Sequence, residues 1–481
     1  MKRLATGVPG LDAILGGGIE PGGVAVLTGP PGTGKTVLAQ QICFATATER
    51  HHAVYYTTLS EPHSKIVRHL DHFSFFDQDA LGPKVEYLHL GDLIREEERE
   101  GLSAVVAEIV RKVLDERPVL VVIDSARVLR DFTDAGQLRT AFYDLTSRLA
   151  HSQTALLLVG EYTPAEMRGG PEFVLADSII QLMYEPREPI DRRWMRIIKM
   201  RGARHLEGKH TFRIDAAGFT FYPRIETLDT GAPATVTGRI GAGVDGLGEL
   251  MGGGIGAGEA TVVLGPSGVG KTILGLRFVV EGLDRGERCL YVTFQDTAEQ
   301  LIKMASGFGW DLQTPVDKGQ LVIHHVPLGD LDLDMLAAGV RRELEGRRTG
   351  RVVIDSLAEM VHAARELERF PAYARALTGL IRASGASLLI TSETTTLGPS
   401  AEPVGGVMFL FHNVILLRYI ELASSTGRAL SIVKMRNSDH SKDVHQFQIT
   451  AEGFALGERL DQVTGTLGWS ALRGQDGAAA L

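Results

Sequence analysis

The sequence predicts an α/β fold with two tandem domains, each a mainly parallel, doubly wound sheet flanked by helices. A phosphate-binding motif occurs twice, apolar runs alternate with helical patterns in both halves, and 481 residues are too many for one typical core. We expect the domains at residues 1–228 and 239–460, joined by a linker at 229–238. The glycine- and alanine-rich residues 461–481 are expected to form a flexible tail.

The two phosphate-binding loops match the pattern G-x-x-x-x-G-K-[ST], and their lysines, Lys35 and Lys271, stand 271 − 35 = 236 residues apart. In such a loop the glycines let backbone N–H groups surround an anion, the lysine reaches the β- and γ-phosphates, and the threonine ligates Mg²⁺. An apolar run precedes each loop and a helical pattern follows it, as the motif requires. ATP and Mg²⁺ are therefore expected as ligands of two loops: Gly29, Pro30, Pro31, Gly32, Thr33, Gly34, Lys35 and Thr36, and Gly265, Pro266, Ser267, Gly268, Val269, Gly270, Lys271 and Thr272.

The repetition extends beyond the loops. Gly16-Gly17-Gly18 recurs as Gly252-Gly253-Gly254, and we expect each triplet to end a short helix, because glycine adopts positive φ without steric cost. After each loop helix an apolar run predicts a strand, at 53–58 and 289–294. Helical patterns at 102–116 and 334–344 follow. Later apolar runs predict further strands at 154–159, 178–182, 387–390 and 413–417.

A carboxylate ends one strand in each half. The runs 119–124 and 351–355 close with Asp124 and Asp355, each followed by serine. An aspartate at the carboxyl end of a strand beside the phosphate loop can hold Mg²⁺ or its waters. The alternative is an aspartate that only caps the next helix, but the recurrence at corresponding places favours the metal. The sequence therefore predicts two Mg²⁺ sites, Thr36 with Asp124 and Thr272 with Asp355.

Composition favours a soluble cytoplasmic protein. No apolar segment approaches the roughly 18 residues of a membrane span, and the N-terminus has no apolar signal core. Cys43 and Cys289 fall in different repeats and are interpreted as small buried residues. A net charge of −9 argues mildly against DNA as a partner without excluding it.

These features resemble the KaiC family, whose members carry two RecA-type ATPase modules in tandem; the likeness spans residues 5–460. The shared motifs are Gly-Gly-Gly-Ile before each loop, Ile-Asp-Ser at the strand end, and Lys-Met-Arg near the end of each module. The resemblance implies a homohexamer of two rings with ATP between neighbouring subunits. Lys199 and Arg201, and in the second ring Lys434 and Arg436, would then reach the γ-phosphate of the next subunit. The alternative is an ordinary surface basic pair.

The chain departs from the family where two adjacent glutamates would orient or deprotonate the attacking water. Here these places hold Ser60-Glu61 and Gln295-Asp296, so one carboxylate remains in each domain. Serine is no comparable base, and glutamine orients water without accepting its proton. We therefore predict slow hydrolysis in both halves, with Glu61, Gln295 and Asp296 as the groups nearest the water.

A second departure concerns autophosphorylation. The places of the family's adjacent Ser-Thr pair hold Met408 and Phe409, which have no hydroxyl group. Clock-style autokinase activity is therefore not expected.

Three functions remain open. The first is a nucleotide-dependent, hexameric regulatory switch with a signalling protein as a further partner. The second is a RadA-like recombination ATPase, which the acidic balance and the lack of a zinc-type cysteine cluster disfavour. The third is a nucleotide-binding scaffold with little turnover, suggested by Ser60 and Gln295.

Overall fold

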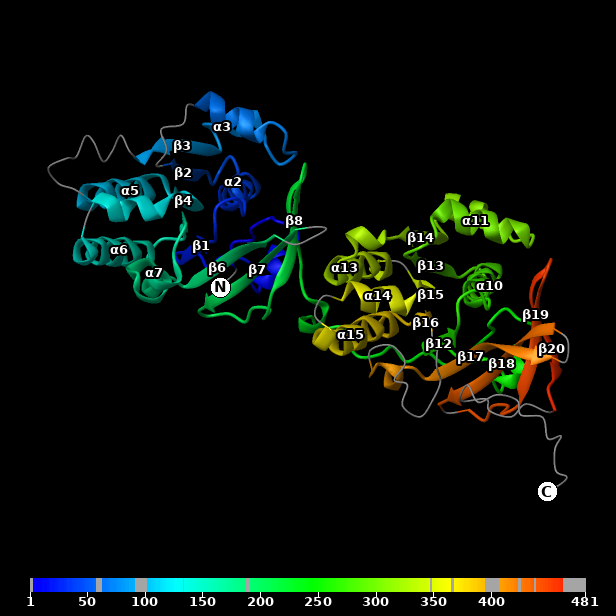
Figure 1. Ribbon diagram of the computed structural model, residues 1–481. Helices are drawn as coiled ribbons and strands as arrows, with labels where there is room; N and C mark the ends of the chain where they lie inside the picture. The colour runs from blue at the N-terminus through cyan, green and yellow to red at the C-terminus, as the bar shows by residue number, and fades with distance from the viewer. Residues whose placement is uncertain are drawn as a thin grey trace, which may run out of the picture. The chain divides into compact units, whose positions relative to one another are not determined.

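The computed structural model describes residues 3–57, 63–90, 102–132, 134–186, 191–346, 348–364, 367–393, 406–422, 425–436 and 438–461. The chain divides into two compact units, residues 1–228 and 229–481 (Figure 1). Glu61 and the tail beyond residue 461 lie outside the described residues.

The first unit contains a nine-stranded sheet with the order β3-β2-β4-β5-β1-β6-β7-β8-β9. Its strands are β1 (Val24–Thr28), β2 (Ala53–Thr57), β3 (Val85–His89), β4 (Leu120–Asp124), β5 (Ala155–Gly160), β6 (Ser178–Glu185), β7 (Arg192–Met200), β8 (His210–Asp215) and β9 (Gly218–Tyr222). Its helices are α1 (Leu11–Ile14), α2 (Lys35–Thr46), α3 (His63–Leu70), α5 (Leu102–Glu116), α6 (Ala135–Leu149), α7 (Pro164–Gly169) and α8 (Pro171–Leu175), with 3₁₀ helices η1 (Gln78–Ala80), η2 (Ala126–Phe132) and η3 (Ile225–Thr227).

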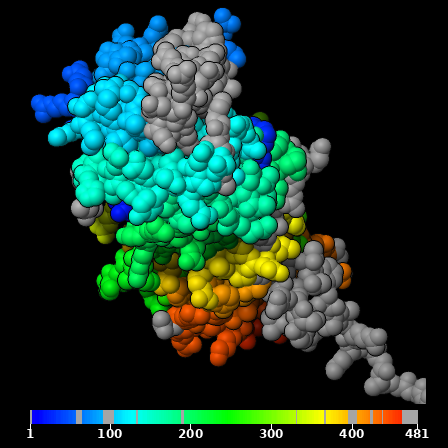
Figure 2. Space-filling model, turned by 90° about the vertical axis from the view of Figure 1, so that its left-hand side faces the viewer, coloured from blue at the N-terminus to red at the C-terminus, as the bar shows by residue number. Residues whose placement is uncertain are grey.

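Both faces of this sheet are buried, because the strands β1 to β6 pair in parallel and helices cover each side. Side chains alternate along β1: Ala25 and Leu27 pack with α2 in one apolar cluster, whereas Val24 and Val26 pack with α5 and α6 in the other. Helices α5 and α6 lie side by side at the surface (Figures 1 and 2). The predicted α/β class is thus confirmed.

The second unit repeats the topology, with the sheet order β14-β13-β15-β16-β12-β17-β18-β19-β20. Its strands are β10 (Arg239–Ile240), β11 (Ile255–Gly256), β12 (Ala260–Gly265), β13 (Arg288–Thr293), β14 (Leu321–His325), β15 (Thr349–Asp355), β16 (Ser387–Glu393), β17 (Asn413–Leu422), β18 (Ser425–Met435), β19 (Val444–Thr450) and β20 (Gly453–Arg459). Its helices are α9 (Leu247–Leu250), α10 (Lys271–Asp284), α11 (Ala298–Gly307), α12 (Gln313–Asp317), α13 (Leu333–Leu344), α14 (Leu357–Ala363) and α15 (Phe370–Ala383), with 3₁₀ helices η4 (Leu328–Asp330), η5 (Leu367–Arg369) and η7 (Met408–Leu410).

In each sheet the pairing of the strands changes from parallel to antiparallel after the strand that flanks the phosphate-loop strand. From β6 and from β17 onward the strands run antiparallel. In each unit two more strands follow the one that ends at Lys-Met, so the basic tripeptide lies in the middle of the antiparallel part rather than at the close of the domain. This extension leaves the phosphate loop at the carboxyl edge of the parallel strands.

The glycine triplets behave as predicted. Gly16, Gly17 and Gly18 follow α1 with φ of 66°, 113° and 118°. A Cβ atom on Gly18 would stand 2.0 Å from the Leu4 carbonyl oxygen, so the close backbone approach also requires glycine here. Both cysteines are buried, and burial raises the pKa of the Cys289 thiol to about 12.

Candidate functional site

The first phosphate loop connects β1 to α2 at the carboxyl edge of the sheet. Gly32 and Gly34 have φ of 74° and 89°, the left-handed conformation that lets the loop turn into the helix. The Lys35 ammonium is buried; it donates a hydrogen bond to the Pro30 carbonyl oxygen at 2.9 Å and pairs with Glu161 at 3.1 Å. The lysine is therefore held over the loop in which an anion would bind.

Thr36 and Asp124 are brought together as the sequence predicts. The Thr36 hydroxyl donates to Asp124 Oδ2 at 2.7 Å, and the Tyr55 hydroxyl donates to the same oxygen at 2.6 Å. Burial first, and then the carboxylate of Asp124, raise the pKa of Tyr55, so its hydroxyl remains a donor. A hydroxyl and an ionised carboxylate are the hard oxygen ligands that suit Mg²⁺.

The second domain repeats this arrangement. The Thr272 hydroxyl donates to Asp355 Oδ2 at 2.8 Å, and Tyr291 donates to the same atom at 2.9 Å. The Thr391 hydroxyl donates to the other oxygen, Oδ1. Lys271 donates to the carbonyl oxygens of Gly265 and Pro266 at 3.0 and 2.9 Å. The two halves thus share one site geometry.

The carboxylates that face the loop lysines were not predicted. Glu161 follows β5, which pairs with β1, and in the second domain Glu393 ends β16 and lies 4.0 Å from Lys271. Their place at the carboxyl end of a neighbouring strand is the signal that identified Asp124, so the same reasoning could have found them. About half of the Glu161 side chain is exposed, which makes its ion pair weak and replaceable by a phosphate.

A second unpredicted group is a tyrosine–arginine pair on β6 and β7. Arg193 lies over the ring of Tyr184 and donates to the Gly32 carbonyl oxygen at 3.0 Å. In the second domain Arg428 lies over Tyr419 in the same way. Both pairs are next to their own phosphate loop.

The Lys-x-Arg pairs lie elsewhere. In the sheet, Lys199 of β7 lies opposite Ile179 of β6, and Ile179 is level with Val26 of β1. Val26 is three residues before Gly29, the first residue of the loop. Its ammonium donates to the Phe173 and Val174 carbonyl oxygens at 3.1 and 2.9 Å. In the second domain Lys434 donates to Phe411 at 2.8 Å and Arg436 donates to Phe409 at 3.0 Å.

These cations therefore occupy the edge of the sheet opposite the phosphate loop. Burial, together with the neighbouring arginine charge, lowers the pKa of Lys199, and the same two causes lower the pKa of Lys434. Arg201 lies 3.7 Å from Asp177 on this same edge. The structure does not bring either basic pair to the loop of its own domain.

The flank of the second site contains Gln295 and Asp296, which follow β13 after Phe294. The Gln295 side chain is exposed and its amide nitrogen donates to Glu359, a residue that the sequence reasoning did not single out. Burial and the charge of Asp355 raise the pKa of Asp296, while His325 acts in the opposite direction.

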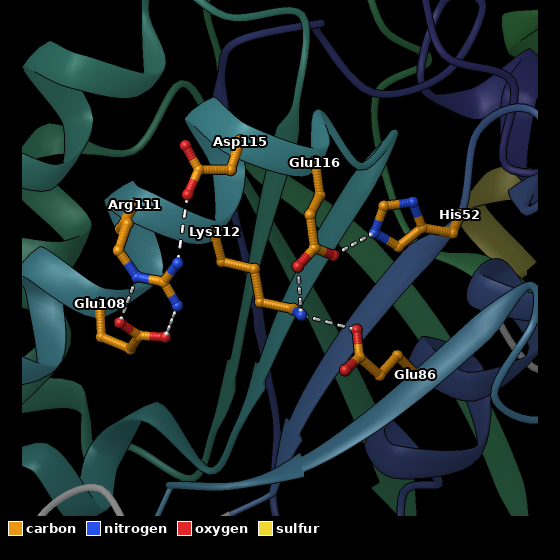
Figure 3. Close-up of polar contacts among 7 residues, drawn as sticks. All are labelled: His52, Glu86, Glu108, Arg111, Lys112, Asp115 and Glu116. Atoms are coloured by element: carbon orange, nitrogen blue, oxygen red, sulfur yellow. Dashed lines mark hydrogen bonds and ion pairs between the residues drawn. The ribbon is translucent and has the colours of Figure 1, made fainter.

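A separate acidic group in the first domain already has a cation at its centre. Ligand atoms of His52, Glu86 and Glu116 lie within 4.8 Å of one another, but the Lys112 ammonium contacts Glu86 and Glu116 at 2.8 Å each (Figure 3). The hydrogen bond from Lys112 lowers the pKa of Glu116. Since the lysine ammonium pairs with both carboxylates and occupies the place between them, we assign no metal to this group.

Comparisons with known proteins point to one family. The family described as "ATPase: KaiC" matches residues 4–226 and, a second time, residues 240–461. "Circadian clock oscillator protein KaiC" of Parathermosynechococcus lividus is 27% identical over 470 residues, which cover 95% of this chain and 85% of that protein. "Circadian clock protein KaiC3" of Synechocystis sp. is 27% identical over 482 residues, with 97% and 94% covered.

Within the described residues no helix combines the length and the apolar character needed to cross a bilayer. The resemblance drawn from the motifs is confirmed, because the two family matches together span nearly all of the sequence. The chain belongs to the KaiC family of ATPases and carries two tandem copies of its domain.

Proposed function

We propose that this protein is a Mg²⁺-dependent ATPase that hydrolyses ATP slowly and acts as a homohexameric regulatory switch in the cytoplasm. The observation that carries the proposal is the duplicated pairing of a loop threonine with a strand-end aspartate, at 2.7 Å in the first domain and 2.8 Å in the second. Membership of the KaiC family supports the same chemistry.

The first loop has room for a Mg²⁺-bound nucleotide. A Cβ atom on Gly32 would meet nothing within 4 Å, so the loop has open space on that side, whereas one on Gly34 would stand 2.7 Å from the Phe219 ring. We infer that Thr36 and Asp124 hold the metal in the first domain, and Thr272 and Asp355 in the second. When bound, Mg²⁺ neutralises charge on the β- and γ-phosphates.

Slow turnover is proposed from the groups available to orient water. Gln295 can accept a hydrogen bond from water but cannot take its proton. Asp296 is the remaining carboxyl group on this flank, and burial and the charge of Asp355 raise its pKa. In the first domain we propose Glu61 for this role on the sequence alone, since it lies outside the described residues.

We further propose that Lys199 and Arg201, and Lys434 and Arg436, complete the site of a neighbouring copy. Their position at the opposite edge of the sheet supports this role, because a cation there can serve a phosphate only across an interface. We therefore propose other copies of the chain as partners, and a signalling protein as a further partner.

Phosphate release tests the enzyme assignment. Lys35→Ala and Lys271→Ala each remove one loop lysine, and the double variant removes both. We expect each single variant to retain part of the parent rate and the double variant to retain none. If the parent releases no more phosphate than the double variant, the chain is a nucleotide-binding scaffold, a role that the amide at Gln295 favours.

Light scattering with and without Mg-ATP tests the assembly. Because a ligand shifts an oligomer only through its differential affinity, we expect the hexamer to depend on nucleotide. A monomer under both conditions would refute the hexamer and the completion of the site by a neighbour.

A further inference from the structure

The second domain has a buried carboxylate that the first domain lacks. Glu359 stands in the first turn of α14, four residues after Asp355, and its exposed fraction is 8%. Four residues after Asp124 the first domain has Val128. A buried charge is costly unless hydrogen bonds compensate it, so the contacts of Glu359 indicate what holds it there.

Two side chains donate to Glu359. The Ser356 hydroxyl donates to Oε2, and the Gln295 amide nitrogen donates to Oε1. An ionised carboxylate only accepts hydrogen bonds, so Gln295 must present its NH₂ group to Glu359. The orientation of the Gln295 amide is thereby fixed, with its oxygen directed away from Glu359.

This contact lies at the nucleotide edge of the sheet. Gln295 comes two residues after Thr293, which is level with Asp355 in the neighbouring strand. Burial lowers the pKa of Lys271, while the charges of Glu393, Asp355 and Glu359 act in the opposite direction. The field of Glu359 therefore reaches the lysine of the phosphate loop.

We propose that Glu359 is a positioning residue of the second domain, which holds the Gln295 amide so that its oxygen accepts a hydrogen bond from the water that attacks the γ-phosphate. In the opposite orientation the NH₂ group would face this water and could not accept its proton in a hydrogen bond. The inference rests on the proposed hydrolysis. Gln295 alone could present either its oxygen or its NH₂ group to the water, and the buried carboxylate of Glu359 selects the oxygen.

Phosphate release by the full chain tests the inference, with the second-domain rate taken as the rate above that of Lys271→Ala. In Glu359→Gln a neutral amide replaces the carboxylate and can bond to Gln295 in either orientation. We expect kcat of the second domain to fall roughly 10- to 100-fold, with KM for ATP unchanged, as for other misplaced groups. Gln295→Ala should lose as much, and the double variant should lose no more. Glu345→Gln, which alters an exposed ion pair with Arg341, is the control and should keep the parent kcat.

The outcomes separate the two proposals. If the parent is no faster than Lys271→Ala, hydrolysis by the second domain is refuted and the positioning role with it. If the parent is faster than Lys271→Ala but Glu359→Gln keeps the parent kcat, only the positioning role is overturned. The same follows if the kcat losses of Glu359→Gln and Gln295→Ala multiply in the double variant. If Glu359→Gln unfolds at a lower temperature than the parent, the Gln295→Ala variant is used instead, because Gln295 is exposed. A kcat of Gln295→Ala equal to that of the parent also overturns the inference.

Discussion

The proposed completion of each site by a neighbour predicts that two variants, each inactive in the second domain, restore one another. The variants are Arg436→Ala and Lys271→Ala. Arg436 is level with His412, and His412 is level with Ala260, five residues before Gly265 at the start of the loop. At about 3.3 Å per residue this separation is about 16 Å along the sheet, beyond the reach of an arginine side chain. An arginine so placed cannot serve its own phosphate loop.

Each variant alone should lose the second-domain rate by about 10³-fold or more, as when an arginine finger is removed. In hexamers assembled from equal amounts of both, a site is complete where the intact loop of an Arg436→Ala copy faces the intact arginine of a Lys271→Ala copy. Random assembly gives this pairing with a probability of 1/2 × 1/2, so about one quarter of the sites are active. The mixture should therefore recover about a quarter of the second-domain rate of the parent.

Phosphate release measures the recovery after subtraction of the Lys271→Ala/Arg436→Ala double variant, whose remaining rate comes from the first domain. Arg459→Ala is the control, because Arg459 is exposed and pairs only with surface carboxylates among the described residues; it should keep the parent rate unmixed. A mixture no faster than its two components would refute completion of the site by a neighbour, since co-assembled copies would then have failed to supply the missing cation.

Three further predictions follow from the described contacts. Thr272→Ala should raise the Mg²⁺ concentration for half-maximal phosphate release about 10-fold or more. An unchanged Mg²⁺ titration would contradict the proposal that Thr272 and Asp355 together hold the metal. Burial and Asp355 raise the pKa of Asp296, and a carboxyl group takes a proton from water only when ionised. The second-domain rate should thus fall on acidification at a higher pH than an ordinary aspartate would give, and Asp296→Asn should remove this limb of the pH profile. Gly18→Ala should lower the free energy of unfolding more than Gly82→Ala, which should lower it by about 1 kcal/mol. Both glycines have positive φ, but of the two only Gly18 lacks space for a Cβ atom. Equal denaturant midpoints for the two variants would refute this reasoning.

The fold could be predicted where the sequence signal is local. The helix predicted at 102–116 is α5 (Leu102–Glu116), and each strand predicted from an apolar run is present, although β17 continues to Leu422, beyond its expected end at Leu417. Strands β3 and β14, which both lie at a sheet edge, were missed, as were the antiparallel strands β8, β9, β19 and β20. Polar side chains such as Glu86 and His89 interrupt the apolar pattern of β3 there.

Only those parts of the site that are formed by short, continuous sequence motifs could be predicted. The loops and the strand-end aspartates are short motifs, whereas the hydrogen bond from Tyr55 to Asp124 depends on the register that sets Thr57 level with Asp124. The contact of Gln295 with Glu359 likewise joins residues that are 64 positions apart. A sequence without known pairings does not show such contacts, because the residue types alone are compatible with an ordinary strand or helix.

The polar surroundings of the two aspartates differ although their strands correspond. Asp355 accepts hydrogen bonds from Thr272, Tyr291 and Thr391, and Thr391 is level with Val263 in β12. The corresponding place in the first domain, level with Leu27 in β1, holds Val159, which offers no hydroxyl group. Each added donor fixes the carboxylate more firmly. Together with the Glu359–Gln295 contact, this makes the second site, within the described residues, the more pre-organised of the two, so the duplicated fold need not imply equal chemistry in the two domains.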